Sequence, residues 1–505
     1  GTESYHSKIT KIIIPNTIRE ISDYAFYGMS NLKTVEFANG SVLESVGVGA
    51  FMNCKLLTGI VLPDTVKEIE MGAFSGCGAI TSFVVGKEVT YLGAGSFIGC
   101  DKLTEISVED GNSKYSSHDG ILFNEKGTVL LAYPQGRAGA SYTVPSGVTE
   151  IGDYAFATNS KLQVLNLNQT TMIRQYGLAD CSALTTITTN TLKYAEIGAL
   201  DGTTWFQNQT GDQVVLGEVL LSYQGNATEV SLQNISSIAP YAFAGNTNLQ
   251  RLIINSPLHN IGGGAFFQCE NLAEIYLNNT NRMVFIGMNS FGTNSESRKI
   301  YVPQNLYDEY INNDFWKQYI DEITVHQTKI VFDSNGGSVC ADGTVGYLDY
   351  VGELPVPQKD GYVFLGWYDN PEFTGKPVEM GLLWESLENE IALYAKYRQK
   401  SETVYSINYH PNGGKIADDA IRTYTIDDEV TLPSITREHY EFLGWYYDAE
   451  FTQPAGNGWG MDEETGNKDL YAKWRGVLVT ITVKYGSQVL GQVKLFYGSR
   501  AQFPT

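Results

Sequence analysis

Positive charge is scarce in this sequence: 34 Lys and Arg residues stand against 56 Asp and Glu, a formal net charge of −22 over 505 residues. A surface this acidic repels phosphate backbones and anionic lipid headgroups, so nucleic acid is a poor partner candidate. No apolar run approaches the roughly 20 residues of a membrane helix, and we expect no membrane insertion in this segment. The chain starts without a signal peptide, as an exported protein would after signal removal, or as a cytosolic fragment would.

Cysteine and histidine are rare, with six of each. The sequence has no CxxC pair, no HExxH motif, no GxSxG elbow and no GxxxxGK[ST] loop, and no two histidines have a metal-ligand spacing. The stretch at 333–336 weakly resembles a calcium loop, but the downstream Glu is missing. We therefore predict a protein that is not an enzyme, with no catalytic residue, no cofactor and no metal site. An enzyme acting on glycans or peptides is the least favoured alternative.

Phenylalanine, in contrast, returns at a nearly fixed interval. The stretch I-R-E-I-S-D-Y-A-F-Y at 18–27 recurs as V-T-E-I-G-D-Y-A-F at 148–156 and more loosely elsewhere, with anchors 23 (74 − 51) to 25 (51 − 26) residues apart. The anchors are Phe26, Phe51, Phe74, Phe97, Phe156, Phe243, Phe266 and Phe291. Such a period predicts a solenoid, in which each turn buries its apolar face only by stacking on its neighbours.

A second apolar segment, L-x-x-I-x-L, follows each anchor, as at 32–37, 57–62 and 103–108. Alternation directs its aliphatic residues inward and the x residues outward. We expect one short strand per turn, stacked into a long parallel sheet. Counting Leu178 and Leu200 as degenerate anchors gives roughly ten turns.

Five cysteines share one position of the repeat, three residues after the anchor or its substitute. Cys54, Cys77 and Cys100 are 23 residues apart (77 − 54, 100 − 77) and should lie on consecutive turns. The favoured interpretation is a ladder of small buried thiols. A disulfide between adjacent turns stays open as the alternative, because a strand spacing of about 4.8 Å permits it.

Two turns are enlarged. The insertion at 109–140 contains a predicted hairpin, 120–123 paired with 129–133, and V-L-L-S-Y-Q-G at 219–225 echoes its L-L-A-Y-P-Q-G. Insertions on repeats often carry function, so the segments 109–140 and 203–225 are candidate sites.

The repeat I-x-x-Y-A-F-x-x-C/N-x-x-L-x-x-I-x-L-P, with the enlargement G-N-S-K-Y…D-G-I-L-F…L-L-A-Y-P, resembles the BspA-like leucine-rich repeat family over about residues 9–325. The resemblance implies a right-handed solenoid closed by a cap helix at about 305–320. Tyr307, Ile311 and Phe315 have helical spacing, and we expect them to cover the last turn, since a solenoid end needs a cap.

From about residue 329 the period changes to a tandem duplication. The motifs F-x-x-N-G-G, G-Y-x-F-x-G-W-Y and L-Y-A-K-W recur with Trp367 and Trp445 78 residues apart (445 − 367), and Phe364/Trp367 and Phe442/Trp445 are the predicted cores. These copies resemble Listeria–Bacteroides repeats, small β-grasp-like modules similar to the B repeats of internalins. The predicted fold is thus mainly β: a leucine-rich repeat solenoid with a helical cap at 1–326, two modules at 327–400 and 401–476, and a partial third at 477–505.

The outward positions of the strand face offer candidate binding residues. Four apolar side chains, which would be exposed on a regular surface, and two charged neighbours form the predicted partner-binding face: Val61, Val84, Arg251, Ile253, Glu274 and Tyr276. The simpler alternative is that isolated outward Val and Ile only suit strands.

The resemblance implies an extracellular bacterial surface protein, an adhesin or interaction scaffold that binds a host or bacterial surface protein or glycan through the solenoid. In this hypothesis the chain is a monomer and the C-terminal modules act as a spacer. A structural stalk without its own ligand is the alternative.

Overall fold

The computed structural model describes residues 8–278, 281–292, 297–461 and 463–500. The chain forms two compact units, Gly1–Gln327 with Gly346–Asp349, and Thr328–Val345 with Tyr350–Thr505. The ends of the predicted first and last domains, 1–7 and 501–505, lie outside the described residues.

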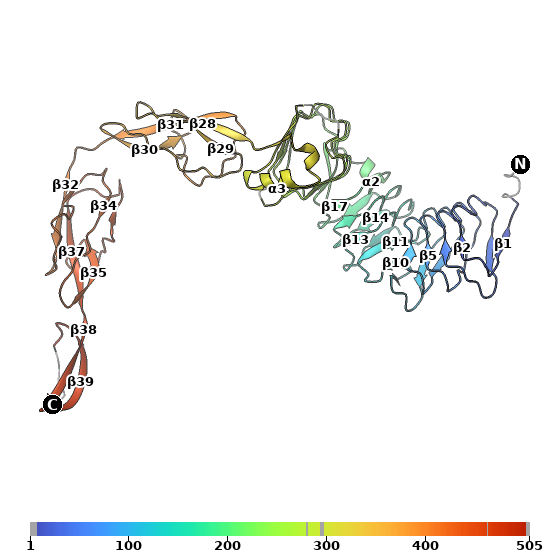
Figure 1. The fold of residues 1–505 in the computed structure, drawn as a ribbon, viewed down its shortest axis with the longest axis horizontal. Coiled ribbons are helices and arrows are strands. Elements are labelled where there is room, and N and C mark those ends of the chain that lie inside the picture. Colours follow the sequence, from blue (N-terminus) through green and yellow to red (C-terminus); the bar gives the residue numbers. More distant parts are fainter. Residues whose placement is uncertain (1–7, 279–280, 293–296, 462, 501–505) are drawn as a thin grey trace. The chain divides into compact units, whose positions relative to one another are not determined.

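The first unit is a stack of coils (Figure 1), which confirms the predicted solenoid. Short strands from most coils form the outer-face sheets, in which neighbouring strands are parallel: β1(Lys11–Ile14), β3(Thr34–Phe37), β6(Ser82–Val85), β8(Glu105–Val108), β12(Ser141–Thr143), β14(Val164–Asn166), β16(Thr186–Thr188), β20(Glu229–Leu232), β22(Arg251–Ile254), β24(Glu274–Leu277), β26(Lys299–Tyr301) and β27(Ile323–Thr324). In β22 and β24 the register pairs Leu252 with Ile275, both fully buried, as alternation requires.

A second set of two-residue strands pairs in parallel from coil to coil, in sheets that also take in the strands of the two hairpins. Its members are β2(Glu20–Ile21), β4(Ser45–Val46), β5(Glu68–Ile69), β7(Tyr91–Leu92), β13(Glu150–Ile151), β15(Met172–Ile173), β17(Tyr194–Ala195), β21(Ser237–Ile238), β23(Asn260–Ile261) and β25(Phe285–Ile286). Each leads into a tight corner that contains the anchoring phenylalanine or, after β15 and β17, its substitutes Leu178 and Leu200.

The corners are held together by a ladder of rings and amides. The rings of Phe26, Phe51 and Phe74 stack with centroids 5.1 and 5.6 Å apart. The backbone follows the same order, because the amide of Phe51 donates to the carbonyl of Ala73 at 2.8 Å. At Phe51 the corner therefore buries an aromatic ring and pairs a backbone amide that a buried turn would otherwise leave without an acceptor.

The five repeat cysteines are free thiols, as the favoured interpretation expected. Each Sγ donates to the carbonyl of an anchor, as Cys77 does to Phe51 at 3.1 Å and Cys269 to Phe243 at 3.1 Å. Burial raises the pKa of the Cys269 thiol to about 11 and that of the Cys100 thiol to about 12. These thiols are therefore neutral hydrogen-bond donors rather than thiolate nucleophiles.

One expected outer-face strand is missing, which corrects the prediction of a strand in every turn. Residues 57–63 contain no strand, so β3 and β6 belong to separate two-stranded sheets. The physical reason lies in the sequence, since Gly59 has no side chain to pack and Pro63 has no amide to continue a ladder. The outer face is therefore interrupted at this turn.

The two enlarged turns contain the predicted hairpins. β10(Ile121–Asn124) pairs antiparallel with β11(Val129–Ala132) and with β9(Tyr115–His118), and β18(Gln213–Leu216) pairs with β19(Val219–Tyr223). A short helix, α2(Thr204–Gln207), precedes the second hairpin. The hydrophobic core falls into three clusters, at 14–122, 121–239 and 220–323, whose boundaries coincide with these two turns.

The cap is made of shorter helical pieces than the single helix predicted at 305–320. It consists of η1(Gln304–Leu306), α3(Tyr307–Asn312) and η2(Lys317–Tyr319). Trp316 and Tyr310 are fully buried, Tyr307 and Ile311 are half-buried, and Phe315 is 64% exposed. The prediction for Phe315 was wrong because the helix ends at Asn312, so that helical spacing no longer applies to Phe315.

The second unit contains two similar mixed sheets and a hairpin. The first sheet has the order β29-β28-β31-β30, the second β33-β32-β37-β35, and in each the two central strands are parallel. Trp367 and Trp445 are buried as predicted, with Phe364 and Phe442 half-buried beside them. The bounds are β28(Gln327–Asp333), β29(Gly343–Gly346), β30(Tyr362–Tyr368), β31(Glu390–Gln399), β32(Tyr405–His410), β33(Thr423–Tyr424), β34(Val430–Thr431), β35(Tyr440–Tyr446), β36(Gly458–Trp459), β37(Lys468–Gly476), β38(Leu478–Tyr485) and β39(Gln488–Phe496).

Candidate interaction surfaces

The interrupted turn creates an open groove on the outer face. The groove has a volume of about 940 Å³ and is lined by β3, by residues 59–65 and by two residues of β6. Val61 is 84% exposed and Val84 is 47% exposed, so both stand in solvent as the sequence predicted. β3 and β6 are edge strands of separate sheets on either side of the interrupted turn, and the segment at 59–63 lies between them with Ile60 in the core.

The charge of the groove is negative. Glu36 faces outward on β3 and forms an ion pair with Lys11 at 2.6 Å, while Asp64 is exposed at the other end of the groove. Ile13, the register partner of Glu36, is 60% exposed and extends the apolar surface along the same face. In the sequence, the run of three isoleucines at 12–14 indicates this exposed apolar residue, because alternation along a strand turns the middle one outward.

The other four predicted residues lie together on β22 and β24, several turns away. Arg251 binds Glu274 at 2.5 Å and Glu229 at 3.2 Å, and the Tyr276 hydroxyl donates to Glu274 at 3.4 Å. The hydrogen bond to Glu274 is the largest cause that raises the pKa of Arg251. These charged groups are therefore already engaged with one another.

Two of these four residues are not exposed, which corrects the expectation for them. Tyr276 is only 2% exposed and Ile253, its register partner, 9%. The Tyr276 ring stacks on Tyr301 at 4.4 Å and meets His326 edge-on at 5.8 Å. Burial, and then the charge of Glu274, raise the pKa of Tyr276. The chain that follows the cap covers this part of the face, which the repeat pattern alone does not reveal.

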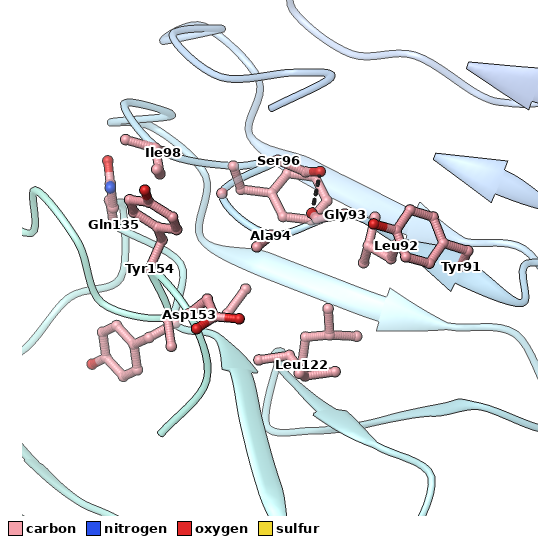
Figure 2. A pocket seen from close by; sticks show the side chains of 16 residues that line it. Tyr91, Leu92, Gly93, Ala94, Ser96, Ile98, Leu122, Gln135, Asp153 and Tyr154 are labelled. Carbon is pink, nitrogen blue, oxygen red and sulfur yellow. Dashed lines mark hydrogen bonds between the residues drawn. The ribbon is translucent and has the colours of Figure 1, made fainter. Parts of the chain in front are cut away.

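The first enlarged turn carries a different kind of site, a cavity of about 240 Å³ (Figure 2). Its walls come from the corner at 91–98, from the hairpin, and from the corner at 153–155. The predicted candidate segment 109–140 includes Gln135 of this cavity, but the prediction did not include Asp153 and Tyr154 from the following corner. The sequence feature that indicates this altered corner is the tyrosine of L-L-A-Y, Tyr133, which takes the place of a corner phenylalanine. The rings of Tyr133 and Phe156 stack with centroids 4.8 Å apart.

The repeats of the first unit match a known protein family. The model of the BspA type leucine rich repeat region, in six copies, matches residues 4–119, 138–209 and 216–336. The chain belongs to this family. The Listeria-Bacteroides repeat domain matches residues 329–396 and 405–473. BspA-type repeats thus form the solenoid and Listeria-Bacteroides repeats form the two modules, as the motifs predicted.

Curated relatives share only part of this architecture. A protein of Evansella cellulosilytica, named as a Gly-rich membrane protein, is 28% identical over 185 residues, which is 36% of this chain and 20% of that protein. Internalin H of Listeria monocytogenes is 31% identical over 153 residues, which is 28% of this chain and 24% of that protein. The chain thus spans about a quarter or less of these relatives. Within its described residues, it has no helix of the length and apolarity needed to cross a bilayer.

Solved structures with similar coils include two bacterial proteins. A leucine-rich repeat protein from Eubacterium ventriosum is 20% identical, with 60% of this chain and 86% of that chain covered and a TM-score of 0.36. The pneumococcal vaccine antigen PcpA is 23% identical, with 62% and 77% covered and a TM-score of 0.37.

Proposed function

We propose that this chain is an extracellular bacterial surface protein whose solenoid binds a protein or glycan of a host or neighbouring cell. The groove at Val61 carries the proposal, because exposed apolar side chains line an open hollow there, on a turn that forms no strand. Large exposed apolar groups on a rigid scaffold are typical of interaction sites. In this proposal the chain acts as a monomer and the two modules are a spacer.

The groove favours an extended protein segment as the occupant. The backbone of residues 59–62 belongs to no strand ladder, so its amides and carbonyls are donors and acceptors that a bound extended segment can use. Val61 and Val84 supply the apolar contacts, and Glu36 and Asp64 favour a partner that carries basic residues.

A non-enzymatic role is part of the same proposal. The five buried thiols are held protonated, so they do not provide a nucleophile. His410 on β32 and Asp469 on β37 form a pair at 2.9 Å on the surface of a module, and the His410 ring stacks on Tyr471, an arrangement that suits surface structure.

A binding screen with matched variants tests the proposal. The immobilised chain is exposed to a panel of extracellular-matrix proteins, cell-surface glycans and whole bacterial cells. The double variant V61K/V84K is expected to lower the affinity for the bound partner by at least roughly tenfold, since it places two charges in an apolar contact that provides at least 1.4 kcal/mol.

The control is V164K, which changes a 39% exposed valine on the uninterrupted sheet of β14. We expect its binding to equal that of the unchanged chain. If no panel member binds, or if V61K/V84K binds as well as V164K, the stalk without a ligand of its own is the better account.

A further inference from the structure

The cavity of the first enlarged turn exists because one corner of the stack is missing. In the preceding turn the amides of Gly72 and Phe74 donate hydrogen bonds to the next corner of the stack. Their acceptors there are the carbonyls of Ala94 and Ser96. In the next turn, β11 runs straight through the corner position, because it pairs with β10 of the hairpin. The corner at 91–98 therefore has no corner stacked on it, and a cavity of about 240 Å³ is left (Figure 2).

Two backbone donors face this gap. The amides of Gly72 and Phe74 point toward the next corner along the chain. Gly95 and Phe97 occupy the same two positions one coil later, so their amides point toward the missing corner. Neither amide has an acceptor in the part of the chain that the structure describes. Both residues line the cavity, so these amides are fixed donors for a bound group.

Acceptors lie on the opposite wall. The Asp153 carboxylate points into the space between the corner and Leu122 (Figure 2) and makes no hydrogen bond or ion pair with any described residue. The equivalent Asp23, in the first coil, accepts from the amide of Val48 at 2.7 Å. Gln135 is 6% exposed, and its Nε2 donates to Ala157 and Thr158 while its Oε1 has no partner.

The remaining walls are apolar or aromatic. Leu122 and Leu131 form one side, and the rings of Tyr91 and Tyr154 flank the opening. Tyr91 is 47% exposed. The Tyr154 ring lies beside Gly95, with its Cδ2 3.7 Å from the place that a Cβ atom would occupy at this residue. A ligand in this cavity would thus contact polar groups at its edge and apolar groups on its faces.

This lining selects a small neutral ligand with many hydroxyl groups. The cavity is below the roughly 300–1,000 Å³ of pockets for drug-sized molecules, so it suits one ring. Asp153 disfavours an anion, and the two amide donors disfavour an ammonium group, whereas a hydroxyl both donates and accepts. We propose that the cavity binds a single hexose unit, with Asp153 and the amides of Gly95 and Phe97 bonding its hydroxyls.

The second enlarged turn provides an internal contrast. Its following corner reads I-A-P-Y-A-F at 238–243, so Pro240 stands at the position of Asp153. Pro240 offers no side-chain acceptor, and we therefore assign the hexose site to the first enlarged turn only. This site is separate from the groove at Val61 and does not depend on the partner proposed there.

Saturation-transfer NMR with the full chain and the methyl glycosides of glucose, galactose, mannose and N-acetylglucosamine tests this assignment. At least one glycoside is expected to bind with a Kd on the order of 1 mM. Ala94→Met should abolish binding, because Ala94 lines the cavity and the longer side chain takes up space inside it. Asp153→Ala should weaken it about tenfold through the lost charged acceptor.

The control is Gln175→Ala, at the same corner position one turn later, where the side chain is exposed and outside the cavity. It should bind like the unchanged chain, and circular dichroism should show the same melting for all variants. The assignment is overturned if none of the glycosides binds, or if a binding signal persists in the Ala94→Met variant.

Discussion

Replacing Phe266 by alanine is expected to lower the free energy of unfolding of the solenoid by about 3–5 kcal/mol. The Phe266 ring is fully buried and stacks between Phe243 at 4.9 Å and Phe291 at 5.5 Å. The substitution leaves a cavity in the middle of the ring ladder, which neighbouring turns cannot close because each is fixed by its own hydrogen bonds. Urea unfolding followed by circular dichroism measures the loss.

The adjacent Phe267 supplies the control. It is the same residue type in the same corner but is 40% exposed. Phe267→Ala should therefore change the free energy of unfolding by no more than about 1 kcal/mol. Equal losses for Phe266→Ala and Phe267→Ala would show that ring stacking does not hold the coils together.

The second large effect is expected at the cap. Trp316 is fully buried, meets Tyr310 edge-on at 4.9 Å, and its Nε1 donates to the carbonyl of Val284 at 2.8 Å. Trp316→Ala removes the packing and leaves that buried carbonyl without its indole donor, a loss of about 3–5 kcal/mol. Because an uncapped solenoid frays from its end, amide exchange should rise first in β25 and β26.

Phe315, one residue earlier, is 64% exposed and serves as the matched control. Phe315→Ala should leave both the unfolding midpoint and the exchange of β25 and β26 unchanged. If Phe315→Ala destabilises the chain as much as Trp316→Ala, the helical spacing seen in the sequence describes the cap better than the structure does.

The repeat made the solenoid predictable because its signal is carried by many copies. Phenylalanine at the corner and alternating aliphatics after it give each turn the same low-energy arrangement, so stacking order and register follow from the spacing alone. The cysteine ladder and the hairpins of the enlarged turns were predictable for the same reason. Trp367 and Trp445 likewise follow from a duplicated motif.

What the repeat could not show are the places where single residues depart from it. Gly59 and Pro63 remove one strand of the outer face, although the aliphatic pattern around them is intact. Tyr276 has an outward position but is buried by Tyr301 and His326, which lie later in the chain. The cavity polar groups come from two corners and a hairpin, and no local pattern brings Gly95 and Asp153 together.

In this structure the first enlarged turn interrupts the ladder of corner hydrogen bonds and thereby opens a site. Hydrogen exchange of the full chain, read at single residues by mass spectrometry, tests it at equivalent positions. The amides of Phe51 and Phe74 donate to the next corner at 2.8 and 3.2 Å and should exchange slowly. The amide of Phe97 faces the cavity and should exchange faster by orders of magnitude. Protection of Phe97 equal to that of Phe74 would contradict the account.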